Sequence, residues 1–185
     1  EEAEILAEQL SRNTAYLGDA GQANVAAAAV VVLGIGGTGS HVAHLLGRTG
    51  VGRLRLIDPA CVSEHSLGSH AVATRSDLGT LKAVVSQRQL KRVVPACIVE
   101  VVPKRLTAAN AAALLWGTGE DGAGGATRKP DFVVACLPVD APGETTGSLA
   151  AAIVECLHAN VKCFPVIYAA DDADSAALAG TQAEV

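Results

Sequence analysis

The 185-residue sequence contains no methionine and very few aromatic residues. Only 3% of the residues are Phe, Trp or Tyr although 50% are hydrophobic, so the core must be built from Ala, Val, Leu and Ile. A chain of this length can bury such a core as a single domain. Because even an initiating Met is missing, we expect the chain to be a segment of a longer protein.

Other features that the chain lacks disfavour several classes of protein. The formal net charge of -5 argues against a broad nucleic-acid-binding face, though not against a local basic patch. The five cysteines include no C-x-x-C pair, which disfavours a zinc ribbon or a thioredoxin-type motif, and their odd number suits a reducing intracellular compartment. The most apolar window, at about residues 25–33, is too short to span a bilayer.

The most informative stretch is residues 30–40, where an aliphatic run meets a cluster of glycines. Gly34, Gly36 and Gly39 have the spacing G-x-G-x-x-G, and a helical pattern begins at once. A strand, a tight turn and a helix N-terminus in succession form a place where backbone amides bind phosphate.

Periodicity along the rest of the chain indicates alternating strands and helices. Strands are predicted at about 29–33, 54–58, 97–102, 131–137 and 163–168. Helices are predicted at about 2–17, 39–48, 77–94, 107–116 and 147–159. This alternation predicts an α/β fold of the Rossmann-like, doubly wound type, with a mainly parallel sheet and helices on both faces.

The predicted domain organisation has three parts. Residues 1–24 form an N-terminal helix and lead-in, residues 25–170 form the nucleotide-binding domain, and residues 171–185 form an acidic, alanine-rich tail. In a doubly wound sheet the ligand binds outside the carboxyl ends of the strands, at the switch point beside the first strand.

Asp58 ends the second predicted strand about twenty residues after the glycines, where a carboxylate accepts ribose hydroxyls. The glycines and this carboxylate fit an ATP site and an NAD site equally well. A glycine turn that serves packing alone is a third alternative.

Five sequence segments carry a more specific resemblance. They are EQLSRNTAYLGDAGQ at 8–22, GIGGTGS at 34–40, GVGRLRLID at 50–58, SLGSHAVAT at 66–74 and DLGTLK at 77–82. Together they resemble the ATP-dependent adenylating family that includes the ubiquitin-activating enzymes and the ThiF-type adenylyltransferases of the molybdopterin and thiamine pathways. Within it, the chain is most similar to the tRNA threonylcarbamoyladenosine dehydratases, especially their eukaryotic forms. The similarity is dense over about residues 5–102 and collinear to about 168.

The resemblance implies a role for each motif. Asp58 holds the ribose, Lys82 reaches the triphosphate, and Arg12 reaches the ATP of the partner subunit in a dimer. The phosphates lie on the glycine loop, which consists of Gly34, Gly36, Gly37, Thr38, Gly39 and Ser40. The implied reaction adenylates the threonyl carboxylate on a tRNA adenosine and then closes a ring with net loss of water. The implied partners are tRNA and a second subunit, identical or related, and some eukaryotic relatives are mitochondrial.

Two departures from the family pattern affect the charge-screening part of the site. Gly68 and Ser69 occupy the places of an Asn-Arg pair that precedes the position of His70. Pro138 occupies the place of the family's magnesium-binding Asp, for which Asp140 is the candidate substitute. Loss of one such charge clamp costs about 2.7–4 kcal/mol of transition-state stabilisation.

Three hypotheses follow from these motifs and departures. The first is an active ATP-dependent dehydratase that uses magnesium, and the second is a degenerate relative that serves as a structural or regulatory subunit of a larger assembly. The third is an NAD-binding domain. We further expect His65 and His70 to lie on the loop surface, and the cysteines to be small buried hydrophobic residues rather than nucleophiles.

Overall fold

The computed structural model describes residues 2–117, 129–137 and 145–166. The strands are β1 (Ala29–Leu33), β2 (Arg53–Ile57), β3 (Ile98–Val102), β4 (Phe132–Ala135) and β5 (Lys162–Pro165). The helices are α1 (Glu2–Ala27), α2 (Gly37–Arg48), α3 (Lys82–Val93), α4 (Ala111–Trp116) and α5 (Thr145–His158), with short 3-10 helices η1 (His65–Gly68) and η2 (Arg75–Asp77). We call residues 58–81, between β2 and α3, the crossover segment.

The five strands form one sheet in the order β3-β2-β1-β4-β5, and every pair is parallel. The order runs outward from β1 in one direction through β2 and β3, and in the other through β4 and β5. The switch point therefore lies between β1 and β4, where Leu33 is in register with Ala135. The predicted Rossmann-like α/β fold is confirmed.

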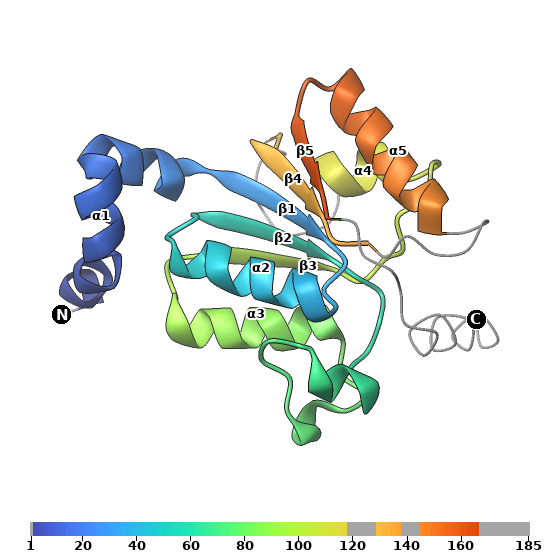
Figure 1. Cartoon of the computed structure of the whole chain (residues 1–185), viewed down its shortest axis with the longest axis horizontal. Coiled ribbons are helices and arrows are strands. Elements are labelled where there is room, and N and C mark those ends of the chain that lie inside the picture. The colour runs from blue at the N-terminus through green and yellow to red at the C-terminus, as the bar shows by residue number, and fades with distance from the viewer. Residues whose placement is uncertain (1, 118–128, 138–144, 167–185) are drawn as a thin grey trace.

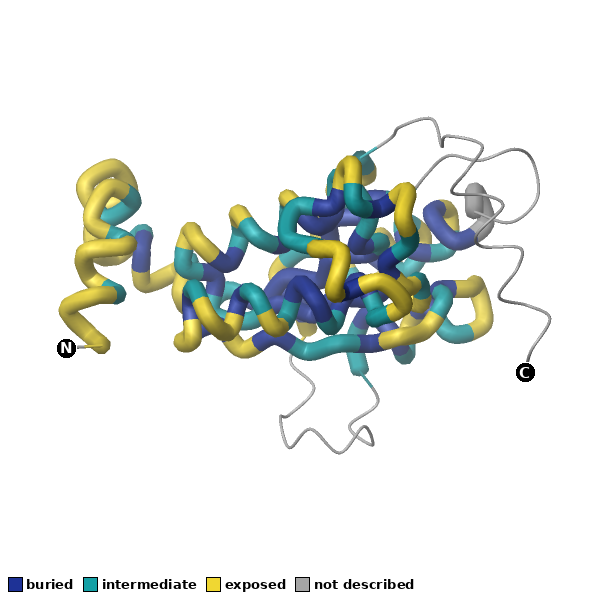
Figure 2. The backbone as a smooth tube through the Cα atoms, turned by 90° about the horizontal axis from the view of Figure 1, so that it is seen from below, coloured by how far each residue is buried: buried dark blue, intermediate teal, exposed yellow. Residues whose placement is uncertain are grey.

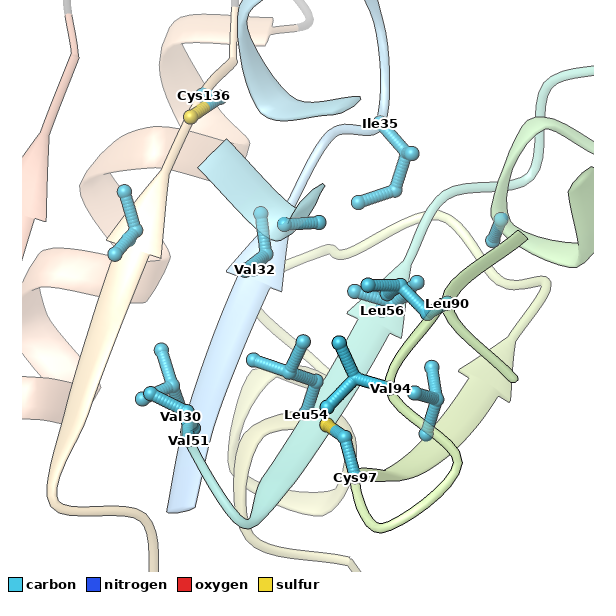
Figure 3. Close-up of a cluster of buried hydrophobic side chains, with 14 residues drawn as sticks. Val30, Val32, Ile35, Val51, Leu54, Leu56, Leu90, Val94, Cys97 and Cys136 are labelled. Carbon is cyan, nitrogen blue, oxygen red and sulfur yellow. The ribbon is translucent and has the colours of Figure 1, made fainter. Parts of the chain in front are cut away.

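Helices cover both faces of the sheet (Figure 1). α2 and α3 pack on one face through a cluster that includes Val32, Leu54 and Leu90, drawn in Figure 3. α4 and α5 pack on the other through Val31, Val133 and their neighbours. Every residue of β1 is buried, as expected for the central strand of a sheet covered on both sides.

The N-terminal helix differs from its predicted bounds. The break was predicted at Gly18, and there the backbone does leave helical geometry, with φ 72° and ψ 168°. The predicted end of the first helix at Gly18 is therefore confirmed, and a second helical stretch, which was not predicted, continues to Ala27. The residues of α1 are mostly exposed (Figure 2). No helix of the described ranges combines the length and the hydropathy that crossing a bilayer requires.

The first residue of α3 also differs from the prediction, which changes the position of Lys82 in the helix. A cap at Ser76 or Asp77 was predicted, but α3 begins at Lys82. The Asp77 carboxylate instead accepts hydrogen bonds from the amide and the hydroxyl of Thr74, at 2.8 and 2.7 Å, which closes η2. Similarly, α4 follows Asn110 rather than Thr107. The predicted tail at 171–185 lies outside the described residues.

Candidate functional site

The glycine loop turns the chain sharply at the carboxyl end of β1. Gly34 has φ +77°, and its amide donates to the carbonyl of Ile57 at 2.9 Å. A Cβ on Gly34 would lie 2.5 Å from the carbonyl oxygen of Cys136, and one on Gly39 would lie 1.8 Å from the carbonyl oxygen of Gly34. Both contacts are impossible, so the loop and the first turn of α2 can only pack this closely as glycine.

The first turn of α2 presents unused backbone donors. The amide of Ser40 donates to the carbonyl of Gly36 at 3.0 Å, which is the first bond of the helix. Within the described chain, the amides of Gly37, Thr38 and Gly39 donate no hydrogen bond. Because these three N–H groups share the positive end of a twelve-residue helix, they form a site for an anion.

Ser40, predicted as a phosphate ligand, has its hydroxyl engaged elsewhere. The side chain is buried, and its Oγ donates to the carbonyl of Gly37 at 2.9 Å. The same oxygen accepts the amide of Ala71 at 2.9 Å. Ser40 therefore fastens the crossover segment to the glycine loop.

Asp58 holds the glycine loop from the end of β2. Its side chain is buried; Oδ2 accepts the amide of Ile35 at 2.5 Å and Oδ1 accepts the amide of Ala60 at 2.7 Å. A carboxylate has about four lone-pair sites, so these bonds leave acceptor capacity on both oxygens. The position is compatible with the predicted contact to ribose.

Lys82 reaches the same place from the start of α3. Its amide donates to the carbonyl of Ala60 at 3.0 Å, so Ala60 links it to Asp58. The side chain is only 8% exposed, and its ammonium forms no hydrogen bond or ion pair within the described chain. An ammonium that no group of the protein neutralises is available to an anionic ligand.

His70 is buried, at 6% exposure, so its predicted place on the loop surface was wrong. Its Nδ1 accepts the amides of Val72 and Ala73 at 3.3 and 3.1 Å, which leaves the ring proton on Nε2. Burial, and then the charges of Lys82 and His41, lower the pKa of His70 to about 4. The ring is thus neutral at pH 7 and shapes the crossover segment. His65 is exposed, as predicted.

Of Gly68 and Ser69, which were predicted to stand in place of an Asn-Arg pair, Ser69 lies beside the glycine loop. A Cβ on Gly37 would lie 3.1 Å from the Cβ of Ser69, so the Ser69 side chain borders the loop directly. Gly68 is exposed, and a Cβ there would meet no atom within 4 Å. Ser69 therefore lies at the wall of the anion site.

Arg12 is not brought to this site within one chain. It is exposed on α1 between Gln9 and Asn13, whose side chains donate to the carbonyls of Val93 and Thr49, each at 3.2 Å. Those carbonyls lie at the C-terminal ends of α3 and α2. The glycine loop is at the other end of α2, about 18 Å away for twelve residues.

The predicted metal position cannot be assigned geometrically. Pro138 and Asp140 lie outside the described residues, and within the described ranges no group of three His, Cys, Asp or Glu side chains could hold a metal. The chain does reach the site just before them, since the Leu137 side chain would contact a Cβ on Gly34 at 3.2 Å.

The cysteines lie in or beside the core, with one exception. Cys97, Cys136 and Cys156 are buried, and burial raises the pKa of their thiols to about 11, 11 and 12. Such thiols stay protonated and unreactive at neutral pH. Cys163 is half-buried, whereas Cys61 is exposed, so its prediction as a buried residue was wrong.

The site geometry is accompanied by a family match over most of the chain. The sequence profile of the ThiF family matches residues 10–140, a range that contains the glycine loop, Asp58 and Lys82. The chain belongs to the ThiF family. The resemblance inferred from the five sequence segments is therefore confirmed.

The most informative relatives of this ThiF-family chain act on tRNA or on a carrier protein. The tRNA threonylcarbamoyladenosine dehydratase 1 of Saccharomyces cerevisiae is 32% identical over 133 residues, which cover 72% of this chain and 29% of the yeast protein. The sulfur carrier protein adenylyltransferase of Thermus thermophilus is 37% identical over 99 residues, covering 54% and 36% of the two chains. The chain thus spans about a third of these curated relatives.

Solved structures show the same fold. The Escherichia coli tRNA N6-threonylcarbamoyladenosine dehydratase in complex with ATP superposes with a TM-score of 0.73 at 25% identity, covering 86% of this chain and 58% of that one. The Escherichia coli MccB structures are 22% identical, with TM-scores near 0.70, and support the fold alone.

Proposed function

We propose that the glycine loop, Asp58 and Lys82 bind ATP, and that the chain is the adenylating domain of an enzyme similar to tRNA threonylcarbamoyladenosine dehydratase. The observation that carries this proposal is the link through Ala60, which joins the Asp58 carboxylate to the first residue of α3. This link supports a common role for Asp58, as the acceptor of ribose hydroxyls, and for Lys82, as a cation with no partner in the described chain. The likeness to a dehydratase in complex with ATP supports the same assignment.

The proposed roles follow from what each group can do. The amides of Gly37, Thr38 and Gly39 donate to phosphate oxygens, and Lys82 compensates their charge from the opposite side. Asp58 accepts ribose hydroxyls while it holds Ile35, so that binding the ribose and shaping the loop depend on one carboxylate. Adenylation converts a poor leaving oxygen of a carboxylate into a good one, and the site must screen negative charge during the attack.

The proposed substrate is a carboxylate on a tRNA nucleoside, followed by cyclisation with loss of water, as the names of the dehydratase relatives suggest. We also propose a dimer, with itself or with a related subunit. Since Arg12 lies about the length of α2 from its own glycine loop, it could act only on a partner's site. All five thiols are free, which suits a reducing compartment, either cytoplasmic or mitochondrial.

A second candidate function, a catalytically degenerate subunit of a larger assembly, is favoured by Ser69. Its short side chain borders Gly37 where the family's arginine would supply a cation. Pro138, in place of the expected magnesium-binding carboxylate, also favours a catalytically degenerate subunit. We therefore propose magnesium, with Asp140 as its ligand, only for the active enzyme, where it would neutralise phosphate charge.

The two candidates are separated by AMP release. The protein is incubated with ATP, magnesium and tRNA that carries threonylcarbamoyladenosine, and AMP and pyrophosphate are measured. We expect AMP formation that depends on the modified tRNA and is lost in Lys82→Ala. ATP binding without AMP formation would reject the active enzyme and leave the degenerate subunit.

A further inference from the structure

A second polar cleft, of about 530 Å³, lies between the crossover segment and α3. On the crossover side it is lined by Thr74, Ser76 and Asp77. On the side of α3 it is lined by Arg88, Gln89 and Arg92, and Arg92 neighbours the other two because it follows them by four and three residues. None of these residues belongs to the nucleotide site described above.

The one carboxylate in this cleft is already neutralised. Asp77 is 3% exposed; its Oδ2 accepts two hydrogen bonds from Thr74, and its Oδ1 accepts one from Arg88, with which it forms an ion pair. The Arg88 side chain nevertheless remains 48% exposed, and a guanidinium has five N–H donors. Arg88 therefore keeps exposed N–H donors for a further acceptor, although Asp77 already balances its charge.

The other cation of the cleft is unpaired. Arg92 is exposed and forms no hydrogen bond or ion pair within the described chain. Ser76 adds a hydroxyl, which contacts that of Thr74 at 2.9 Å, and Gln89 adds an amide. The polar groups left for a ligand are thus mainly donors, and Arg92 carries a positive charge that no carboxylate of the described chain balances.

The charge around the cleft is opposite to that of the whole chain. The net charge is -5, yet α3 carries Lys82, Arg88, Lys91 and Arg92 and no acidic residue. No Asp or Glu occurs between residues 78 and 99, and Arg75 stands between two residues that line the cleft. A local basic region in an acidic chain attracts a polyanion to one place rather than to the whole surface.

We propose that this cleft binds successive phosphates of an RNA strand, with Arg88 and Arg92 as the principal contacts. The two residues are one helical turn apart, so their side chains start about 5–6 Å from each other, and each planar guanidinium can bind a phosphate bidentately. Such contacts fix the position of a nucleic acid without reading its sequence. The choice of RNA as the source of the phosphates rests on the proposed function.

The cleft is placed to present RNA to the nucleotide site. The crossover segment contacts the glycine loop through Ala71 and Ser40, and it forms the wall of the cleft a few residues later, at Thr74 and Ser76. A strand bound in the cleft would therefore contact the same segment that borders the anion site. Position and charge together assign the cleft to the docking of the substrate.

The test uses fluorescence anisotropy with a labelled, unmodified tRNA transcript at several salt concentrations. Arg92→Ala should weaken binding about five- to eightfold at 0.1 M salt, from a slope of about 0.7–0.9 per phosphate contact. The log–log salt slope should fall by about 1. Lys162→Ala is the matched control, since Lys162 is exposed at the start of β5, on the opposite edge of the sheet from β3.

The inference is overturned if tRNA does not bind, if Arg92→Ala and Lys162→Ala weaken it equally, or if the arginine dependence appears with poly-glutamate and not with tRNA. Thermal unfolding of each variant confirms that it is folded. ATP calorimetry on the unaltered chain separates the two proposals. Arginine-dependent tRNA binding without ATP binding would reject the proposed function and support this cleft as an RNA site. ATP binding with arginine-independent tRNA binding would support the proposed function and reject this cleft as an RNA site.

Discussion

The Asp58 carboxylate accepts the amide of Ile35 at 2.5 Å, from a position 23 residues further along the chain. This bond ties the end of β2 to the glycine loop after β1, and the other oxygen of Asp58 ties the loop to the segment that leads to Lys82 through Ala60. Asp58 therefore organises the proposed nucleotide site through backbone hydrogen bonds within the chain. Loss of one carboxylate should loosen the loop and remove the ribose acceptor together.

Asp58→Asn should lower both stability and ATP affinity. An amide side chain has one acceptor oxygen for two backbone donors, so one buried N–H loses its partner at a cost of about 1–3 kcal/mol. Urea unfolding measures the stability change and calorimetry measures ATP binding, which should weaken at least about tenfold.

Asp131→Asn is the matched control for this change. Asp131 accepts the amide of Ala29 at 2.8 Å, also at a strand of the central pair but at the amino end of the sheet. We expect its ATP affinity to equal that of the unaltered chain. Equal losses of ATP affinity in both variants would mean that Asp58 acts through general stability alone.

Lys82→Met should separate function from stability. The substitution replaces an ammonium that has no partner in the described chain with an apolar chain of similar length, and should change the free energy of unfolding by less than about 1 kcal/mol. ATP binding should fall strongly, because the positive charge facing the phosphates is gone. Lys162→Met, at an exposed position, should change neither quantity. A Lys82→Met protein that is destabilised would show that the ammonium has a stabilising partner.

Restoring the family pair at residues 68 and 69 should increase catalysis. Gly68 has open space around it and both residues are exposed, so Gly68→Asn with Ser69→Arg should leave the protein folded. We expect the rate of AMP formation to rise by about a hundredfold or more, because loss of one donor that stabilises transition-state charge usually lowers the rate by that factor. Gly68→Asn with Ser69→Gln matches the size without the charge and should give no such gain. Equal rates in the two double variants would show that the missing arginine does not limit the reaction.

Stability should fall as the pH drops from about 6.5 to 4, because His70 is buried as the neutral ring. The unfolded chain takes up a proton near pH 6.5 but the native chain only near pH 4, so acid favours unfolding across that window. The full effect is at most about 3 kcal/mol.

His70→Asn isolates this effect. An Asn Oδ1 can accept the amides of Val72 and Ala73 in an Asx turn, as Nδ1 does in His70, but it does not titrate. Urea midpoints measured from pH 7 to 4.5 should depend less on pH in this variant, whereas His65→Asn, at an exposed position, should follow the unaltered chain. An unchanged pH dependence in His70→Asn would contradict the assignment.

Most of the fold follows from local pattern, whereas several parts of the site do not. The aliphatic run at β1 and the glycine spacing predict the strand, the turn and the start of α2, because each depends on adjacent residues. The start of α3 depends on the Asp77 carboxylate, which is paired with Arg88 eleven residues away, and no nearest-neighbour pattern reveals this pairing. The burial of His70 and the bond between Ser40 and Ala71 likewise arise from segments that meet only in the folded chain.

Calorimetric titration of the folded chain with ATP, and separately with NAD, tests most directly whether the glycine loop, Asp58 and Lys82 form an adenylating enzyme's nucleotide site. We predict that ATP binds at one site per chain, that Lys82→Ala abolishes this binding, and that NAD binds at least about a hundredfold more weakly. Tighter binding of NAD, or ATP binding that is unaltered in Lys82→Ala, would contradict the account.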